Sequence, residues 1–214
     1  MPLDISARPI FARCLARSAA ISERKGGDAY RRRLLAGLTG RVVEVGAGSG
    51  INFHHYPRGV AEVLAVEPEA NLRAMAAAAS REAPVPVRVV PGLAEALPAP
   101  DASADAGVSA GLLCSVPDPA AALAELARVI RPGGELRFFE HVVSPRPRAA
   151  SFQRGLDASG VWASAMGGCH TSRETEAAIA RAGFRIESIE RFTFRPTLLD
   201  LPVAPKILGR ARRS

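Results

Sequence analysis

Residues 42–50 read Val-Val-Glu-Val-Gly-Ala-Gly-Ser-Gly, an apolar run that ends in a Gly-x-Gly-x-Gly turn. The β-branched residues around Glu44 favour a buried strand, and such a strand before a glycine-rich turn is typical of a doubly wound α/β sheet. Gly46 and Gly48 can adopt backbone angles closed to other residues, and they leave room for a ligand against the main chain. A helix starting after the turn would also point free backbone N–H groups at that ligand. The stretch therefore predicts a nucleotide-type ligand.

The glycine spacing and a later acid indicate which ligand this is. The dinucleotide fingerprint needs Gly or Ala at the last position of Gly-x-Gly-x-x-Gly, and that position is Ile51 here. S-adenosylmethionine (SAM) also uses such a turn, and it has no pyrophosphate to seat on a helix. A second strand, predicted over residues 62–67, ends in Glu67, 21 positions after Gly46. A carboxylate at that distance can accept hydrogen bonds from both ribose hydroxyls, and its charge would repel a 2′-phosphate.

Composition and charge describe one globular domain. The chain has 214 residues, 48% of them hydrophobic, which is enough to bury a full core. Its net charge of +7 is carried almost entirely by arginine. We interpret the arginine clusters at residues 31–33 and 210–213 as solvated faces, compatible with weak contact with a membrane surface and not requiring nucleic acid. No run of ~20 apolar residues and no secretory signal is present, so we expect a cytoplasmic protein.

The order of apolar runs and turn residues predicts a three-layer α/β sandwich. Its centre is a Rossmann-like, seven-stranded, mostly parallel sheet with an antiparallel last strand. Among the helices, the first crossover helix is expected to open at residues 51–56, Asp118 is expected to cap another, and Thr171-x-x-Glu174 is interpreted as a capping box. The single domain is divided into an N-terminal helical lid (1–40), a SAM-binding core (41–143), an acceptor-side insertion (144–170) and a C-terminal helix with strands (171–214).

From about residue 41 to residue 212 the chain resembles the class I SAM-dependent methyltransferases. The motifs that carry this resemblance are residues 44–50, Glu67, residues 92–105 and the Arg-Pro-Gly-Gly of residues 131–134. Four further stretches resemble the methyltransferase-like group that includes the animal alkyl-thiol S-methyltransferases: Cys-Ser-Val (114–116), Phe-Glu-His-Val (139–142), Gly-Cys-His-Thr-Ser-Arg-Glu-Thr (168–175) and Leu-Pro-Val-Ala-Pro (201–205). The animal members carry an N-terminal hydrophobic membrane segment, and we do not expect their anchorage here.

The resemblance implies SAM as the cofactor and S-adenosyl-L-homocysteine as its product. It places the glycine turn at the methionine end of SAM, Glu67 at the ribose hydroxyls, and Leu93 with Ala94 beside the adenine. Ala94 stands where some relatives place an acid for the adenine amine, so a backbone group is expected to make that contact. The implied cofactor-binding residues are Glu44, Gly46, Ala47, Gly48, Glu67, Pro68, Leu93, Ala94, Ala110 and Gly111.

Two histidines are the candidates for catalysis. His141 lies near the end of the fifth predicted strand, at the ligand-binding edge, and a neutral imidazole can take a proton near pH 7. His170 precedes the predicted helix cap. His141 could equally be structural, and for His170 a structural role beside the cap is favoured over a place in the pocket. A thiol acceptor, with a pKa near ~8.5, needs little help from a base, whereas a phenol or alcohol needs more.

The cysteines and histidines do not predict a metal site. Cys14, Cys114 and Cys169 are widely spaced, without a disulfide framework or paired zinc spacing. A site built from His54, His55, His141, Cys169 and His170 lacks the ligand spacing of known zinc motifs, so no metal is expected. Apolar neighbours predict that Cys114 is a buried small hydrophobe.

The acceptor pocket is expected at the carboxyl edge of the sheet, under the N-terminal helix and residues 144–168. An apolar lining suits a small lipophilic acceptor such as a thiol, a phenol or a lipid- or quinone-like molecule. The predicted lining residues are Phe11, Leu15, Phe152, Trp162 and Met166. One alternative is a nucleic-acid methyltransferase, which the charge permits but the 5% aromatic content disfavours. Another alternative is a SAM-binding protein without catalysis.

Overall fold

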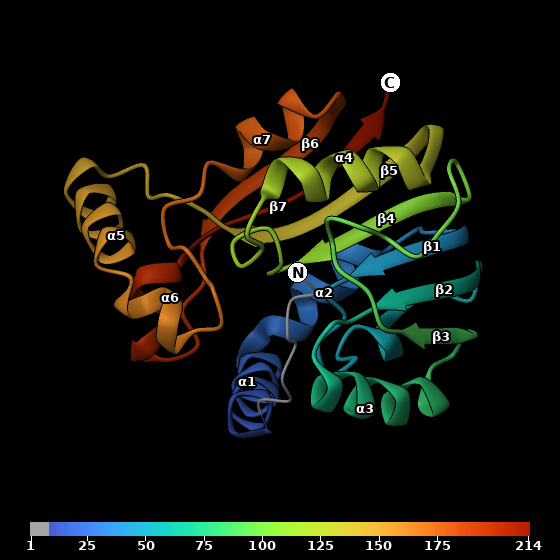
Figure 1. The fold of residues 1–214 in the computed structure, drawn as a ribbon, viewed down its shortest axis with the longest axis horizontal. Helices are drawn as coiled ribbons and strands as arrows, with labels where there is room; N and C mark the ends of the chain where they lie inside the picture. The colour runs from blue at the N-terminus through green and yellow to red at the C-terminus, as the bar shows by residue number, and fades with distance from the viewer. Residues whose placement is uncertain (1–8) are drawn as a thin grey trace.

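The computed structural model describes residues 9–214, so the first eight residues of the predicted lid lie outside the described residues. Seven strands form one sheet in the order β3-β2-β1-β4-β5-β7-β6. The last strand, β7, is antiparallel to both of its neighbours, and the other neighbouring pairs are parallel (Figure 1). The predicted fold class is confirmed. The strands are β1 (Gly40–Val45), β2 (Val60–Val66), β3 (Val87–Val90), β4 (Ala104–Ala110), β5 (Ile130–His141), β6 (Phe184–Thr193) and β7 (Pro205–Arg213).

Helices cover both faces of the sheet. One apolar core lies between the sheet and α4 with α7, and the other lies between the opposite face and α2 with α3. Beyond the arrowheads of the parallel strands lie α5 and α6 (Figure 1). The helices are α1 (Pro9–Ser22), η1 (Glu23–Gly27), α2 (Asp28–Leu35), η2 (Phe53–His55), α3 (Ala70–Ala79), η3 (Ser80–Glu82), α4 (Pro119–Val129), α5 (Pro147–Ser159), α6 (Val161–Ala165), α7 (Thr175–Arg181) and η4 (Leu198–Val203). Among residues 9–214, no helix is long and apolar enough to cross a membrane.

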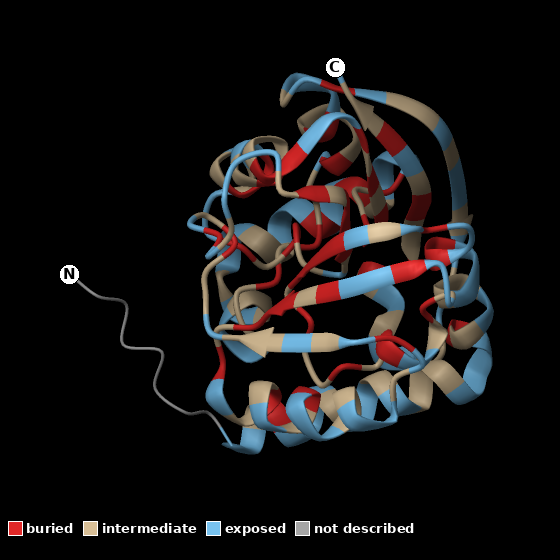
Figure 2. Ribbon diagram, turned by 90° about the vertical axis from the view of Figure 1, so that its right-hand side faces the viewer, coloured by how far each residue is buried: buried red, intermediate tan, exposed pale blue. Residues whose placement is uncertain are grey.

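Burial follows the layers of the fold. Strands β1, β4 and β5 at the centre of the sheet are largely buried, whereas the edge strand β3 is not (Figure 2). Large apolar side chains such as Phe53, Leu126 and Phe138 are almost fully buried. Because both faces of the central strands are covered, their apolar runs are continuous rather than alternating. The carboxyl ends of β1, β2, β4 and β5 thus meet at one rigid edge.

The predicted first crossover helix is wrong. Residues 51–56 form only the short η2 turn before Pro57. The side chains of Asn52 and Tyr56 point inward and donate hydrogen bonds to Glu44 at 2.8 and 2.7 Å. With Pro57 ending the segment so soon after Gly50, too few residues remain for a stable helix. Consequently no long helix N-terminus faces the glycine turn.

One predicted helix cap is confirmed and one is wrong. Asp118 Oδ1 accepts hydrogen bonds from two backbone N–H groups of α4, at 2.9 and 3.1 Å. By contrast, α7 begins only at Thr175 and Glu174 makes no side-chain cap bond. The Thr171 hydroxyl instead bonds to Asp157 Oδ1 at 3.0 Å and to a backbone carbonyl of α5. Because α5 is present to accept these bonds, Thr171 fastens the insertion to the segment before α7.

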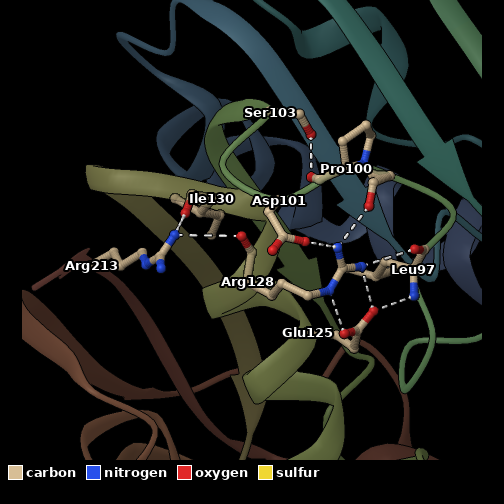
Figure 3. A network of polar contacts seen from close by, with 9 residues as sticks. Leu97, Pro100, Asp101, Ser103, Glu125, Arg128, Ile130 and Arg213 are labelled. Carbon is tan, nitrogen blue, oxygen red and sulfur yellow. Dashed lines mark hydrogen bonds and ion pairs between the residues drawn. The ribbon is translucent and has the colours of Figure 1, made fainter.

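An arginine fastens the irregular segment between β3 and β4. The Arg128 guanidinium, on α4, donates to both oxygens of Glu125, to Asp101 Oδ1 at 2.7 Å and to the Leu97 carbonyl oxygen at 3.1 Å (Figure 3). Glu125 also accepts from the Leu97 backbone N–H at 2.7 Å. The Arg128 side chain holds the pKa of Glu125 below its ordinary value. These bonds hold residues 91–103 against α4, and this segment contributes one side of the cavity described below.

Candidate cofactor and acceptor site

The glycine turn after β1 leaves room for a ligand, but the backbone N–H groups of its first three residues are not free to bind an anion. Gly46 and Gly48 have φ angles of +70° and +57°, and a Cβ on Gly46 would lie 2.6 Å from a side-chain carbon of Leu112. The backbone N–H groups of Gly46 and Ala47 bond to the Val66 carbonyl oxygen at 2.9 and 3.2 Å, and that of Gly48 bonds to Glu67. The expectation of free N–H groups is wrong for these three residues, because the turn closes onto β2. A pyrophosphate would therefore find no cradle in them.

Glu67, at the end of β2, is fixed with its carboxylate at the cavity. The residue is only 5% exposed. Oε2 accepts from the Gly48 N–H at 2.8 Å, and Oε1 accepts from the Glu69 N–H at 2.9 Å. Burial raises the pKa of Glu67, and these two backbone bonds partly offset that rise. Because a carboxylate oxygen has two lone pairs, each oxygen can accept one further hydrogen bond from a ligand.

A buried polar chain reaches the cavity through Glu44, Asn52 and Arg31. Asn52 and Tyr56 hold the two Glu44 oxygens, and burial raises the pKa of this carboxyl group. The Asn52 Oδ1 atom accepts from Arg31 Nη1 at 2.7 Å, and Arg31 Nε pairs with Glu23 at 2.8 Å. Burial lowers the pKa of Arg31. Arg31 and Asn52 were not predicted as site residues. The arginine run at residues 31–33 was interpreted as a solvated face, and Asn52 belongs to no recognised motif.

One cavity of about 540 Å³ collects these groups. That volume lies within the range of small-molecule sites. All ten residues expected to bind the cofactor line it: Glu44, Gly46, Ala47, Gly48, Glu67, Pro68, Leu93, Ala94, Ala110 and Gly111. Glu44 is the most buried acid of the polar chain, and Gly111 is the first residue of the loop after β4. The sequence prediction thus named residues that the fold brings to a single site.

Two segments that are distant in sequence contribute apolar side chains to the cavity. Phe11 and Leu15 on α1 line it, as does Met166 after α6, so three of the five predicted acceptor-side residues are present. The other two are not. Phe152 is 58% exposed on α5, and Trp162 packs in a small cluster of its own, where its indole N–H bonds to Cys169.

The two histidines predicted for catalysis lie outside this cavity lining. His141 is buried at the end of β5, and its Nε2 lies 3.2 Å from the His170 carbonyl oxygen and 3.4 Å from the Cys169 sulfur. His170 is half-buried, and its backbone N–H bonds to the Cys114 carbonyl oxygen at 2.8 Å. Their catalytic roles stay predictions. The structure does bring His141 together with two cysteines, which the sequence analysis did not foresee.

Cys114 and Cys169 form a hydrogen-bonded pair. Cys114 is buried, as expected, but its thiol is not simply a small hydrophobe. The hydrogen bond from Cys114 lowers the pKa of the Cys169 thiol, and bonds from His141 and Trp162 add to this effect against the opposing effect of burial. The same Cys114–Cys169 bond, together with burial, raises the pKa of Cys114. The pKa values of the two thiols are thus shifted in opposite directions.

Glu140 orders the loop that follows β4. It is fully buried, and its Oε1 accepts from the Ser109 hydroxyl at 2.6 Å and from the Leu112 backbone N–H at 3.1 Å. Burial raises the pKa of Glu140, and the two hydrogen bonds act against that rise. Since Gly111 and Leu112 line the cavity, this carboxyl group fixes one wall of the site from behind.

Comparisons with known proteins identify the relatives of this chain. It matches the family described as a methyltransferase domain over residues 43–138. The thiol S-methyltransferase TMT1B of Mus musculus is 36% identical over 182 residues, which cover 83% of this chain and 73% of the mouse protein. The protein of the same name from Rattus norvegicus is 34% identical over 209 residues, which cover 94% and 84%.

A solved structure shares the fold. Geranyl diphosphate C-methyltransferase from Streptomyces coelicolor A3(2), solved with Mg²⁺, geranyl diphosphate and S-adenosyl-L-homocysteine, superposes with a TM-score of 0.69 at 18% identity. The match covers 87% of this chain and 78% of that one. At this identity the likeness concerns the arrangement of the sheet and helices.

Proposed function

Because the chain belongs to the class I SAM-dependent methyltransferases, in the family of the thiol S-methyltransferases, we propose that it methylates a small lipophilic thiol. One observation carries the proposal. A single cavity is lined both by the ten residues expected to hold SAM and by the apolar residues Phe11, Leu15 and Met166. Cofactor and acceptor would therefore meet in one cavity. The curated relatives named thiol S-methyltransferases, at 34–36% identity, support this acceptor class.

The residues present suit SAM. Glu67 offers one open lone pair on each oxygen, directed at the cavity that it lines, for the two ribose hydroxyls. Gly48 leaves open space beside it, since a Cβ there would meet nothing within 4 Å, whereas Gly46 makes room for the Leu112 side chain. Arg31 also lines the cavity, and the planar donors of its guanidinium suit the carboxylate of an amino-acid group. We assign Arg31 to the methionine carboxylate of SAM.

The acceptor wall explains why a thiol would suffice without a base. Bound SAM supplies a methyl group that its positively charged sulfur has already activated. The apolar side chains of Phe11, Leu15 and Met166 exclude water and hold the acceptor sulfur in line with that methyl group. Such positioning can lower a barrier by up to ~7–11 kcal/mol. The thiol would lose its proton to solvent as it enters the cavity, and S-adenosyl-L-homocysteine would be the second product.

One feature of the lining favours a thiol over a phenol or alcohol. Among residues 9–214, no histidine lines the cavity. A thiol with a pKa near ~8.5 is already partly ionised at neutral pH, whereas a phenol or alcohol would need a general base. A site without an imidazole at the acceptor therefore fits the more acidic nucleophile.

The proposal is tested with methyl-labelled SAM and a matched set of acceptors. The set contains one alkyl thiol, the alcohol and the amine with the same chain, a phenol and an RNA. We expect labelled thioether to form at least ~100-fold faster than any other product, the size of preference that separates acceptors needing a base from one that does not. Comparable labelling of the phenol or amine would contradict the acceptor class. Labelled RNA, or SAM binding with no product at all, would instead support one of the two alternative functions.

A further inference from the structure

Three metal-binding side chains from distant parts of the chain meet beside the cavity wall. The Sγ atoms of Cys114 and Cys169 and a ring nitrogen of His141 all lie within 4.8 Å of one another. The three residues are 2%, 7% and 7% exposed, respectively. They come from the loop after β4, from the segment after α6 and from the end of β5. None of the three lines the cofactor cavity, so the cluster is a separate feature.

Two distances in this cluster are close to those of a tetrahedral zinc site. The Cys169 sulfur is 3.4 Å from His141 Nε2, and that nitrogen is 3.2 Å from the His170 carbonyl oxygen. Zinc–sulfur bonds of about 2.3 Å and zinc–nitrogen or zinc–oxygen bonds of about 2.0–2.1 Å put neighbouring ligand atoms about 3.3–3.8 Å apart. The Cys114 sulfur lies within 4.8 Å of the other two ligand atoms, so it moves inward when an ion binds. The His170 carbonyl oxygen, next to His141 Nε2, is the candidate for a fourth ligand.

The surroundings also resemble those of a metal-bound thiolate. The Trp162 indole N–H donates to the Cys169 sulfur at 3.3 Å, and such outer donors orient ligands and tune their basicity. The His170 backbone N–H bonds to the Cys114 carbonyl oxygen at 2.8 Å, so two of the ligand-bearing segments are already joined. Lys206 on β7 is a nearby cation. Its ammonium group donates a hydrogen bond to the Val203 carbonyl oxygen at 3.0 Å, and this acceptor is not part of the cluster.

We propose that Cys114, His141 and Cys169 bind one Zn²⁺ ion, with the His170 carbonyl oxygen as the fourth ligand. Two thiolates balance the charge of the ion, and the set of sulfur and imidazole ligands favours zinc over magnesium or calcium. Four protein ligands in a buried position describe a structural site rather than a catalytic one. The ion joins residues 111–116 to residues 166–170, and both segments contribute to the cavity lining. It thereby fixes the acceptor wall, and His141 acts as a ligand and not as a base.

Cobalt substitution of the reduced, metal-free protein tests the site without any activity assay. We expect one Co²⁺ per chain, with a sulfur-to-cobalt charge-transfer band and the intense visible absorption of tetrahedral cobalt, both removed by added Zn²⁺. Cys169→Ser should weaken binding more than ~100-fold, and Trp162→Phe, which removes only an outer donor, by about tenfold. Cys14→Ser is the matched control, since Cys14 is exposed and outside the cluster, and it should bind as the wild type does.

A second readout on the wild type alone covers variants that fail to fold. Because these two thiols are buried, alkylation is followed in mild denaturant, where bound Zn²⁺ should protect Cys114 and Cys169 from iodoacetamide while Cys14 reacts, and a chelator should remove the protection. The proposal is overturned if the folded, reduced wild type binds cobalt without a charge-transfer band. It is also overturned if zinc leaves the alkylation of Cys114 and Cys169 unchanged, which would mean that the cluster is a metal-free hydrogen-bonded pair.

Discussion

Replacement of Glu67 by alanine should weaken SAM binding while the fold stays intact. The carboxylate is 5% exposed and lines the cavity, and each of its oxygens already accepts one backbone N–H, at 2.8 and 2.9 Å. The remaining lone pairs are the ones available to the ribose. Truncation removes both of these acceptors together with their negative charge. It also leaves the Gly48 and Glu69 N–H groups without their side-chain acceptor.

The magnitude follows from the bonds that are lost. A hydrogen bond to a charged group contributes about 1.5–3 kcal/mol. Two ribose hydroxyls would double this figure, but water entering the emptied position takes over part of the bonding. We therefore expect a loss near the range of one charge-assisted bond, about 1.5–3 kcal/mol, which is a 10- to 150-fold increase in the Kd for SAM.

Isothermal titration calorimetry with SAM and S-adenosyl-L-homocysteine measures this change directly. The matched control is Glu62→Ala, because Glu62 lies exposed on the same strand β2, and its Kd should equal that of the wild type. Thermal unfolding of both variants establishes that they are folded. A folded Glu67→Ala protein with an unchanged Kd would refute the assignment of Glu67 to the ribose, and tighter binding of NAD than of SAM would refute the cofactor itself.

Three further predictions concern the polar chain, the lid helix and acid stability. Arg31→Ala should raise the Kd for SAM about tenfold or more. The control Arg32→Ala removes an exposed ion pair and should change this Kd little. Equal effects of the two substitutions would contradict the role of the buried Arg31 guanidinium. Phe11→Ala should raise the acceptor KM about tenfold without changing the Kd for SAM, because an apolar contact contributes about 1–3 kcal/mol. The control is Ile10→Ala, since Ile10 is 79% exposed on the same helix. A rise in the Kd for SAM instead would place α1 over the cofactor. Burial acts to raise the pKa of Asp157, but four hydrogen bonds from the segment before α7 outweigh burial and lower this pKa. The Asp157 carboxylate therefore stabilises the folded protein above its unfolded-state pKa of about 3.9. This stabilisation is lost as the pH falls through the lower pKa of the folded state. Asp157→Asn should therefore lower Tm at pH 7, with the two curves converging in acid; a constant difference across pH would refute this coupling.

Local sequence was enough to predict that the ten proposed cofactor-binding residues lie together. A strand, a glycine turn and an acid at the end of the next strand are neighbours in the fold whenever the two strands pair in parallel. Glu44, Gly46, Gly48 and Glu67 therefore reach one cavity, as their spacing predicted. The fold class followed from the same alternation of strands and helices, and the antiparallel β7 from the paired apolar runs at the end of the chain.

Local sequence was not enough where burial depends on distant segments. Arg31 belongs to a run of three arginines that looks solvated, yet only Arg31 is paired with Glu23 and Asn52. The first crossover helix failed for a related reason, since the inward bonds of Asn52 and Tyr56 to Glu44 compete with a helix. Pro57 is a local sign that the segment is short, but the inward bonds depend on Glu44 in the preceding strand.

The cysteine cluster shows the same limit more sharply. Cys114, His141 and Cys169 are separated by more than 25 residues from one another, so no short spacing motif could indicate them. They meet because the carboxyl ends of β4 and β5 share one edge of the sheet, onto which the segment after α6 folds back. A search restricted to strand ends and the insertion would have brought these three residues together.

The most direct test of the central claim is the fate of the methyl group in one reaction with a lipophilic alkyl thiol. Methyl-labelled SAM and the thiol are incubated with the wild-type protein and with Glu67→Ala, and the products are quantified by mass spectrometry. We predict labelled methyl thioether and S-adenosyl-L-homocysteine in equal amounts, with the variant slower by its loss of SAM affinity when SAM is limiting. A wild-type protein that binds SAM tightly in the cavity yet produces no labelled thioether would contradict the account.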